Sequence, residues 1–556
     1  MRKLFLAALC CTAILLITYT GYRSYKTWKQ RHLISMARTF ISKGDSRNAM
    51  LSVSQALKAA PWNVEACRLM AELAEAERLP NALAWRSRVV ELDPKSVDDR
   101  LALAKIGMAR RDFATATNAL EGVSPEGKKT VAYHNIAGAV ASSVNRFDEA
   151  KAHFSEAIRL DPQNPFPQLN LAVVQISGTN QPAITEGRVT LQRLSANPTN
   201  STLRTQALRE LVIDSLRYKQ NENALAFSKT LLQQTNASFE DRLLRLEALQ
   251  RSASPEFKTT MIAFEHEAST NAAKIYELSL WQQSHGAVQE GLTWLQSLPP
   301  DTRTNQPVAL LVAESLSTLK DWPGLQRTLE HQNWSASEFI RHAFLARALR
   351  AQELTDSSKG EWGLALKTAN DQKASLVALL RLASQWGWQS EGEELLWSIV
   401  NRYPDEKWAG RALSETLYAG GRTRSLLAFY SQEIKRSPTD LGVKNNLAMT
   451  ALLLGAQELK PHDLAREVYE KSPTNFNFAS TYAFSLYVQK KNDEALKILQ
   501  QLKPETLGDP GIAGYYGLVL QATGNSQQAN KYLDLTSKSK VLPEERKLFD
   551  QARTKL

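Results

Sequence analysis

Cysteine, proline and glycine are scarce in this sequence. Its 556 residues include only 3 Cys, 21 Pro and 25 Gly. Two of the cysteines, Cys10 and Cys11, lie in an apolar N-terminal stretch, so Cys67 stands alone in the rest of the chain and a disulfide-stapled scaffold is excluded. The low Pro and Gly content excludes collagen-like and low-complexity chains. At this length, with 43% hydrophobic residues, the chain must form several domains or a repetitive globular body.

The sequence also lacks the short motifs of common catalytic sites. None of its 8 His belongs to a His-Glu-x-x-His pair, and no Cys-x-x-Cys occurs. Phosphate-binding glycine loops and Gly-x-Ser-x-Gly nucleophile elbows are absent as well. His134 and His153 fall on one predicted helix pair without a set of further ligands, and we interpret them as solvated surface residues. We therefore expect no enzyme, no cofactor and no metal, with no catalytic, cofactor-binding or metal-binding residue.

Acidic residues are missing from the N-terminus, where the positive charge gathers. The formal net charge is +11, but residues 1–44 hold eight basic residues and no acid, so residues 45–556 carry only +3. A nearly neutral body would gain little binding free energy from the release of the counterions of nucleic-acid phosphates. We therefore expect no nucleic-acid partner. Basic residues beside an apolar segment meet anionic lipid head groups instead, a role we assign to Arg23, Lys26, Lys29 and Arg31.

That apolar segment spans residues 4–22 and contains no charged residue. As a helix it would be roughly 28 Å long, which is close to the thickness of the bilayer interior. Tyr19, Tyr22 and Trp28 gather toward one end, as aromatic residues do at membrane interfaces. The alternative is a cleaved signal peptide, although Thr18-Tyr19-Thr20 does not match an Ala-x-Ala cleavage site. We predict an uncleaved transmembrane anchor, followed by a basic juxtamembrane segment up to residue 29.

The side of the membrane on which the body lies is decided by two opposing signals. The four cations after the segment outnumber Arg2, Lys3 and the amino terminus by one, which favours a cytoplasmic body. Bacterial N-terminal anchors that begin with a basic pair often export the domain behind them. We expect a single-pass protein with a periplasmic body, and a cytoplasmic body stays as the alternative.

A repeat of thirty-odd residues dominates the rest of the sequence, and its clearest copy is residues 131–162. Gly138 is followed by Ala150 twelve residues later, and Phe154, Ala157 and Pro162 follow at intervals of four, three and five. Both halves carry apolar residues three and four positions apart, with a short polar turn between them. The unit therefore predicts two amphipathic helices whose small residues allow the helix axes to approach closely, with the proline closing the second helix.

The same spacing recurs upstream and near the C-terminus. Ala37, Ala49 and Ala56 occupy the small positions of the first copy, and later copies follow at Ala71 and Ala104. Near the C-terminus the small positions fall at Ala448 and Ala465, at Ala483 and Ala495, and at Gly517 and Ala529. The packing residues that we assign from the clearest copies are Ala37, Ala49, Ala56, Gly138, Ala150, Phe154, Ala157, Ala483, Ala495, Gly517 and Ala529.

This pattern resembles that of the tetratricopeptide repeat family. The resemblance implies an all-α, right-handed superhelical solenoid, which we expect to contain about 13 helix-turn-helix repeats behind the N-terminal transmembrane helix. We expect clear repeats at 30–198 and 404–556 and degenerate helical repeats at 199–403, with turns at Asn221-Glu222-Asn223, His285-Gly286 and Lys320-Asp321-Trp322-Pro323. A last helix over 543–556, opened by Pro543 and two acids, should cap the exposed face of the final repeat.

Relatives of this kind bind extended peptides or a partner's helix along the concave surface lined by the first helices. The positions predicted by spacing to face that surface are Asn135, Ala139 and Ser142, Asn445 and Met449, and Phe484 and Tyr487. They are neutral or apolar, so a clamp for an acidic C-terminus is not expected. Asn445 and Phe484 would hold a main chain and an apolar side chain; the alternative is that all seven only pack or face solvent.

Tryptophan is concentrated in one region, with nine of the 12 between Trp281 and Trp408. These residues either form a stacking platform for a ligand or fill the space left where small residues have been replaced. We favour the second interpretation.

The sequence as a whole predicts a non-catalytic, membrane-anchored scaffold that binds other proteins through its groove and the membrane through residues 4–22, with a possible part in cell-envelope assembly or secretion. The first alternative is a cleaved, soluble periplasmic or secreted binding protein. The second is an RNA-binding helical-repeat protein.

Overall fold

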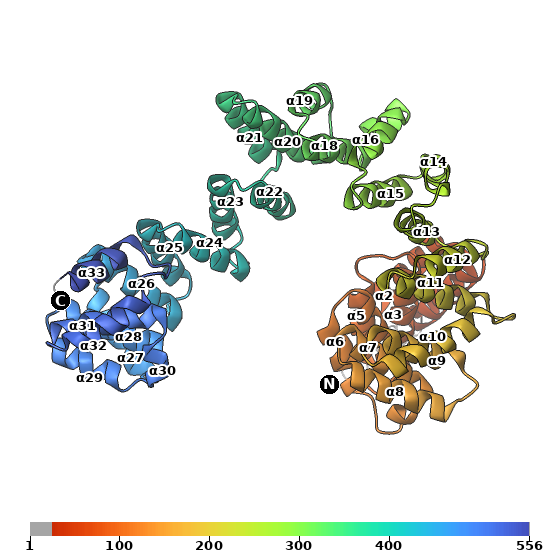
Figure 1. Cartoon of the computed structure of the whole chain (residues 1–556). Coiled ribbons are helices and arrows are strands. Elements are labelled where there is room, and N and C mark those ends of the chain that lie inside the picture. Colours follow the sequence, from red (N-terminus) through yellow and green to blue (C-terminus); the bar gives the residue numbers. More distant parts are fainter. Residues whose placement is uncertain (1–24, 555–556) are drawn as a thin grey trace, which may run out of the picture. The chain divides into compact units, whose positions relative to one another are not determined.

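The computed structural model describes residues 25–554, and every regular element within that range is helical (Figure 1). The chain divides into two compact units, Met1–Gly286 and Ala287–Leu556. Both units consist of helices that follow one another in antiparallel pairs, as the repeat spacing predicts.

The first unit begins, within the described residues, with a helical segment at residues 25–42. The next helices are α2 (Ser46–Ala59), α3 (Val64–Ala76), α4 (Ala82–Leu92), α5 (Val97–Ala109), α6 (Phe113–Glu121), α7 (Val131–Ser143), α8 (Phe147–Leu160), α9 (Pro165–Ser177), α10 (Gln181–Ser195), α11 (Ser201–Arg217), α12 (Asn221–Leu232), α13 (Phe239–Arg251), α14 (Glu256–Ala268) and α15 (Ala272–Ser284). A short 3-10 turn, Gly127–Lys129, precedes α7.

The second unit continues the same alternation. Its helices are α16 (Val288–Ser297), α17 (Pro300–Thr304), α18 (Val308–Thr318), α19 (Trp322–Glu330), α20 (Glu338–Ala351), α21 (Thr355–Thr368), α22 (Lys373–Gln385), α23 (Gln389–Arg402), α24 (Lys407–Ala419), α25 (Thr423–Arg436), α26 (Leu441–Leu454), α27 (Pro461–Lys471), α28 (Phe476–Val488), α29 (Asn492–Gln500), α30 (Pro504–Leu507), α31 (Pro510–Ala522), α32 (Ser526–Leu535) and α33 (Pro543–Arg553). Within the described residues each unit holds seven helix pairs, with α15, α16, α17, α30 and α33 outside the pairs, whereas about 13 pairs are expected from the sequence.

A left-handed backbone residue marks the tight turn inside almost every pair of the described chain. Neighbouring examples lie about 34 residues apart, with one doubled interval between Asn145 and Lys219. A residue of positive φ reverses the chain directly after a helix, and glycine adopts this conformation without steric cost. The series runs through the middle of the chain, where the side-chain signature is weak. Its members are Gly44, Arg78, Arg111, Asn145, Lys219, Ala253, Gly286, Lys320, Glu353, Gly387, Gly421, Gly455, Lys490 and Gly524.

Two of the turns predicted in the middle region lie slightly later in the sequence than the turns of the structure. Helix α12 already begins at Asn221, so the turn is made by Lys219 and Gln220. Helix α19 likewise begins at Trp322, and the Asp321 side chain accepts a hydrogen bond from the backbone N–H of Gly324 at 2.9 Å. An Asp that caps a helix, and a Pro in its first turn, belong to the helix start rather than to the turn before it.

The eleven residues assigned to packing are all buried. Gly138 shows why a small residue is needed, because a Cβ built there would lie 2.6 Å from the ring of Phe154. Gly517 makes the same close approach to Leu533, with 2.7 Å between the built Cβ and Cγ. The paired helices therefore meet where the first helix has the smallest residue and the second has the larger one.

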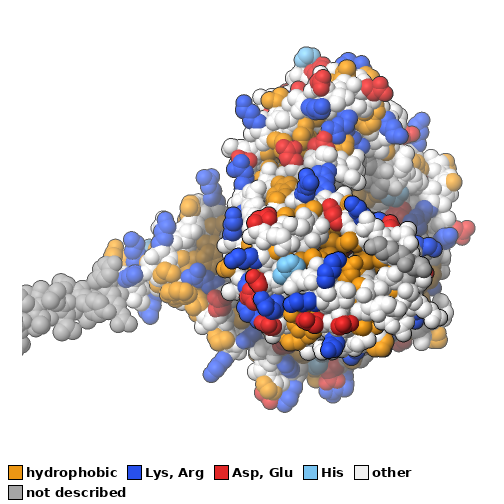
Figure 2. Space-filling view, turned by 90° about the vertical axis from the view of Figure 1, so that its left-hand side faces the viewer, with side chains coloured by type: hydrophobic (Ala, Val, Ile, Leu, Met, Phe, Trp, Pro, Cys, Tyr) orange, Lys and Arg blue, Asp and Glu red, His pale blue; other side chains and the backbone are white. Residues whose placement is uncertain are grey.

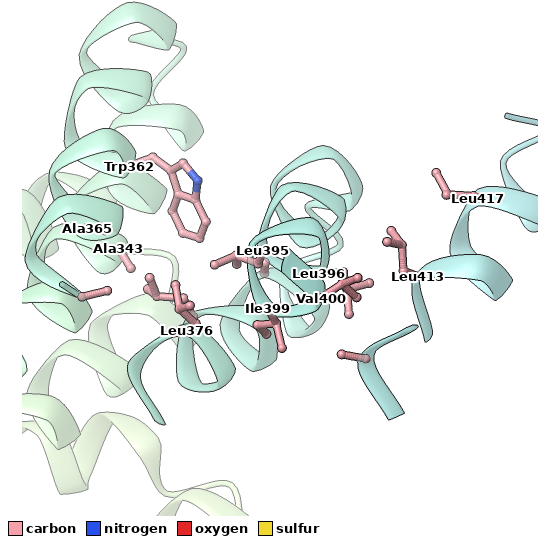
Figure 3. Packing of buried hydrophobic residues seen from close by; sticks show 14 of the residues in the cluster. Ala343, Trp362, Ala365, Leu376, Leu395, Leu396, Ile399, Val400, Leu413 and Leu417 are labelled. Carbon is pink, nitrogen blue, oxygen red and sulfur yellow. The ribbon is translucent and has the colours of Figure 1, made fainter. Parts of the chain in front are cut away.

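Most tryptophans of the tryptophan-rich region pack as core or against it, whereas Trp408 is 41% exposed. Trp281, Trp294, Trp334 and Trp362 are each less than 9% exposed. Trp362 joins a cluster that runs from α20 to α25 and includes Ala343, Leu376 and Leu395 (Figure 3). Trp386 and Trp388 pack against this cluster with ring centroids 5.1 Å apart. These contacts favour the filling of space over a ligand platform.

Ion pairs join neighbouring repeats in the first unit. The guanidinium of Arg68 in α3 binds the carboxylate of Asp99 in α5, and Arg188 in α10 binds Asp214 in α11 at 2.7 Å. Arg209 in α11 binds Asp241 in α13 through two hydrogen bonds of 2.6 and 2.9 Å. Asp214 and Asp241 are almost completely buried, so these arginines neutralise acids that would otherwise be costly to bury.

No helix within residues 25–554 is long and apolar enough to cross a membrane. The predicted transmembrane segment at residues 4–22 and the head-group residue Arg23 lie outside the described residues.

Candidate interaction groove

The final helix of the chain, α33, lies against the first helices of earlier pairs in the second unit. It packs on α26 and α31 as well as on α32, the second helix of the last pair (Figure 1). The sequence predicts a helix over 543–556 that caps the last repeat, and α33 contacts α32 of that repeat. Its contacts with α26 show that it also crosses the face of several earlier repeats.

The apolar side of α33 is formed by Phe549 and Ala552. Both side chains are buried in a cluster with residues from α26, α28, α31 and α32. The ring of Phe549 lies directly over Gly514 of α31, where a Cβ would come within 2.3 Å of the ring. It also makes an edge-on contact with the ring of Tyr515, with centroids 5.5 Å apart. The absence of a side chain at Gly514 thus provides the hole that Phe549 fills.

The residues directly before α33 and at its start contact helices still earlier in the sequence. Leu542 is 2% exposed and joins the cluster that contains Leu413 and Leu417 of α24. The ring of Pro543 lies against Gly421, and the hydroxyl of Thr423 donates a hydrogen bond to Glu544. These contacts connect residues about 120 positions apart in the sequence, which local helix periodicity cannot predict.

A buried carboxyl group holds the first turn of α33. Glu545 accepts hydrogen bonds from the backbone N–H of Leu542 at 2.7 Å and from the hydroxyl of Tyr515. Burial raises the pKa of Glu545 above its ordinary value, although these hydrogen bonds oppose the shift. Burial also raises the pKa of Tyr418 to about 12, with a further contribution from the charge of Glu545. The pKa of Tyr515 is raised for the same two reasons.

Two arginines of α33 fasten the connection from α32. Arg546 donates to the carbonyl oxygens of Thr536 and Ser539, and Arg553 donates to the carbonyl of Leu533 at 2.6 Å. The connecting residues 536–542 are thereby held without helical structure of their own.

Three contacted side chains, Tyr515 of α31 and Leu413 and Leu417 of α24, stand at the sixth, seventh and eleventh positions of their helices. Eight others that line this face or the cavity beside it stand at the fifth, ninth or twelfth position, which is the register of the groove residues proposed from the sequence. We call this set the C-terminal groove. Its residues are Glu415 and Tyr418 of α24, Met449 and Leu452 of α26, Phe484 and Tyr487 of α28, and Gly514 and Leu518 of α31.

The C-terminal groove is only partly filled. A cavity of about 380 Å³ lies between α24, α26 and the first turn of α33. Its lining includes Glu415, Tyr430, Asn446, Met449 and Glu545. The phenol of Tyr430 is largely buried, which raises its pKa, while hydrogen bonds to Ser414 and Asn446 oppose the shift. The wall is therefore mixed, with apolar side chains beside hydrogen-bonding groups.

The predicted groove residues of the second unit are less accessible than expected. Phe484 is 2% exposed, and its ring lies 4.9 Å from that of Tyr515. Met449 and Tyr487 are partly buried against the same cluster as Phe549. Asn445 is 6% exposed, and its side-chain oxygen has no hydrogen-bond partner. Phe484 is thus a core residue covered by α33, and its ring is not open to another chain while α33 is in place.

The predicted groove residues of the first unit, all in α7, are half-buried. The side-chain oxygen of Asn135 accepts a hydrogen bond from Asn170 of α9 at 2.8 Å, which ties two neighbouring repeats together. Ala139 packs beside the cluster that contains Phe154. Ser142 lies near the end of the helix.

Sequence reasoning missed several residues of the C-terminal groove and its polar contacts with α33. Tyr418 and Gly514 stand at the twelfth and fifth positions of their helices, so extending the same register to α24 and α31 would have found them. No local signal marks Tyr515 or Glu545 as partners, because their contact depends on where α33 lies.

His134 and His153 were interpreted as solvated, whereas the structure brings their Nδ1 atoms to 2.9 Å from each other. Burial lowers the pKa of both imidazoles, and the charge of His134 lowers that of His153 further. In the described part of the chain no group of three or more His, Cys, Asp or Glu side chains is arranged to hold a metal ion.

Charges of both signs are interspersed on the face drawn in Figure 2, with hydrophobic side chains exposed between them.

Comparison with known proteins identifies one repeat directly. Residues 131–164, which contain α7 and α8, match the tetratricopeptide repeat family, so the chain contains a tetratricopeptide repeat at this place. No curated protein matches the sequence.

Solved structures with similar helical repeats include a tetratricopeptide repeat protein from Parabacteroides merdae, with a TM-score of 0.39 and 15% identity over 46% of this chain and 99% of its own. PilF of Pseudomonas aeruginosa aligns with a TM-score of 0.31 and 14% identity over 41% of this chain and 98% of its own. A chain of the APC/C hetero-tetramer Cut9-Hcn1 aligns with a TM-score of 0.29 and 12% identity, covering 92% and 96% of the two chains.

Proposed function

We propose that this protein is a non-catalytic scaffold that binds another protein through the C-terminal groove. The observation that carries the proposal is the seating of a helix, α33, on the positions that line this groove. A surface that holds one amphipathic helix by apolar anchors has the chemistry to hold another, as in helix-in-groove recognition.

The composition of the groove supports binding of a protein rather than of a charged small molecule. Its apolar side chains include Met449, Leu452 and Leu518, and Tyr487 is partly buried beside them. Methionine and aromatic side chains are adaptable and are enriched where proteins bind each other. The cavity beside α33 leaves Glu415 exposed at its edge, so a partner can enter from this side.

Photo-crosslinking in intact cells tests this function. A crosslinking amino acid replaces Glu415, which lines the cavity, and in a matched variant it replaces Glu494, which is exposed on α29. Both substitutions remove one exposed glutamate from the second unit. We expect the variant at 415 to capture a distinct protein and the variant at 494 to capture none or much less of it.

Equal capture at the two positions would mean that the C-terminal groove has no special affinity for proteins. Capture at 494 alone would place the interaction on the second helices. Either result contradicts the proposed function.

We further propose that the body is tethered to a membrane by its N-terminus. Tyr25 and Trp28 are 56% and 62% exposed, although large aromatic residues are usually buried. The indole of Trp28 stacks on His32 with ring centroids 5.5 Å apart. Lys26, Lys29 and Arg31 are exposed on the same helical segment. Exposed aromatic and basic residues directly after a 19-residue uncharged segment are typical of a chain that leaves a bilayer.

Membrane fractionation of the full chain tests the tether. The protein should stay with the membranes after alkaline carbonate extraction, and mass spectrometry should find the original N-terminus. A mature N-terminus near Gly21 together with release into the soluble fraction would support the cleaved, soluble alternative.

A further inference from the structure

The contacts of α33 point to the chemical class of the partner, an inference that rests on the proposed function. We propose that α33 occupies the C-terminal groove in place of a partner's helix, and that the groove accepts a helix of the same pattern when α33 leaves. The pattern is Leu-Pro-Glu-Glu, then Phe four residues after the second Glu and Ala three residues later, as in Leu542 to Ala552. The occupant is thus an amphipathic helix of another protein with an acidic first turn.

Each element of the pattern meets a built feature of the groove. The phenylalanine fills the hole over Gly514, and the second acid meets the hydroxyl of Tyr515. The leucine before the helix enters the apolar cluster of α24. A partner helix with these three groups would repeat the same contacts.

α33 buries fewer residues than α26, α28 and α31, the first helices beneath it. Only Glu545, Phe549 and Ala552 are buried among its residues, whereas nine residues of α31 are buried. One of the three is a carboxyl group that burial disfavours in its charged form. Elements with few buried apolar contacts open at lower free energy than the core, and they commonly serve as movable parts.

The cavity beside the first turn of α33 also favours the replacement of α33 by a partner helix. The cavity beside Glu545 leaves part of the C-terminal groove uncovered, so a partner helix can make its first contacts before α33 has left completely.

Three forms of the full chain test the proposal with a fluorescent peptide that spans residues 540–554. The wild type should bind the peptide weakly, because α33 competes at high effective concentration. Phe549→Ala should release α33 and leave the groove intact, so that peptide affinity rises by at least about tenfold. Gly514→Ala should also release α33, but its new methyl group fills the hole, so that the peptide should still bind weakly.

Hydrogen exchange on the same samples shows whether the variants behave as intended. Residues 543–553 should exchange faster in both variants, while α26 and α28 keep their protection. A peptide carrying alanine in place of Phe549 should not bind any of the three forms.

Several outcomes would overturn the inference. If Phe549→Ala releases α33 and the peptide still fails to bind, the groove does not accept a helix. If hydrogen exchange in α33 is unchanged in the variant, α33 is a permanent part of the fold. The same conclusion follows if α26 and α28 lose protection together with α33. A wild-type dimer in light scattering that disappears in Phe549→Ala would make a second copy of this chain the occupant. In each case capture of a protein at position 415 in cells would still support the proposed function.

Discussion

A few single residues decide how closely the helices of a pair approach each other. Gly138 and Phe154 are the clearest case, because the ring of Phe154 occupies the space next to the Gly138 backbone. Such positions are recognisable in the sequence, since a small residue and a large one recur at fixed spacing.

Substitution of Gly138 by Ala is expected to lower stability by about 1–2 kcal/mol, because overpacking outweighs the helix propensity that alanine adds. Gly360→Ala is the matched control, since a Cβ at Gly360 of α21 has nothing within 4 Å. That control should raise stability by up to about 1 kcal/mol. Urea unfolding of both variants measures the difference, and a Gly138→Ala protein as stable as the control would contradict the packing account.

The histidine pair of α7 and α8 is expected to make stability depend on pH. The folded-state pKa values of His134 and His153 are lowered, so the stabilisation that they contribute is present above their ordinary pKa and is lost as the pH falls through the lowered values. Glu149, Glu156 and Arg159 are the nearby charges. Urea midpoints at pH 8, 6 and 5 should fall less in His153→Gln than in the wild type.

His266→Gln is the control for this experiment, because His266 is exposed in the same unit. It should follow the wild-type pH dependence. If His153→Gln followed it equally, the pair would have no part in acid sensitivity.

At the scale of elements, the sequence allowed the helix pairs and most of their turns to be predicted, because periodicity and small residues act within a few turns of the chain. The left-handed turn residues continue this period through the middle region, where Lys219 or Glu353 stands in place of glycine. The placement of α33 could not be predicted in this way. It depends on contacts such as Leu542 with α24, across more than 100 residues, and on a polar cluster without a local pattern.

The free energy of unfolding of the first unit should depend strongly on the buried ion pairs that join neighbouring repeats. Asp241 is 0% exposed and is neutralised by Arg209, which also holds its pKa below the ordinary value despite burial. Arg209→Met would leave this carboxylate unpaired and should cost about 3 kcal/mol or more in urea unfolding. Arg159→Ala removes an exposed pair with Glu156, and its effect should be much smaller than that of Arg209→Met. Equal losses in the two variants would contradict this ranking.

The docking of α33 should weaken as the pH rises. The folded-state pKa of Glu545 is raised, so its favourable contribution is complete below the ordinary carboxyl pKa and is lost as the pH rises through the raised value. Hydrogen-exchange protection of residues 543–553, corrected for the intrinsic rate, should therefore decrease between pH 5 and 8 in the wild type. In Glu545→Gln it should stay constant over this range.

Asp550→Asn changes an exposed acid on the same helix and serves as the control. It should keep the wild-type pH dependence. A flat profile in the wild type, or a sloping one in Glu545→Gln, would show that Glu545 does not govern docking.

At the scale of the whole molecule, two helical-repeat units provide surface without a recognised catalytic motif. The C-terminal groove is where this surface is already used, since it holds a helix of the chain itself. A tether at the N-terminus would keep the groove near a bilayer and raise its local concentration there.

Hydrogen exchange on the full chain, with and without the protein captured at position 415, tests the central claim most directly. We predict added protection in α24, α26 and α28 and faster exchange in α33. Protection confined to the second helices α25, α27 and α29, with α33 unchanged, would contradict a groove that binds its partner in place of α33.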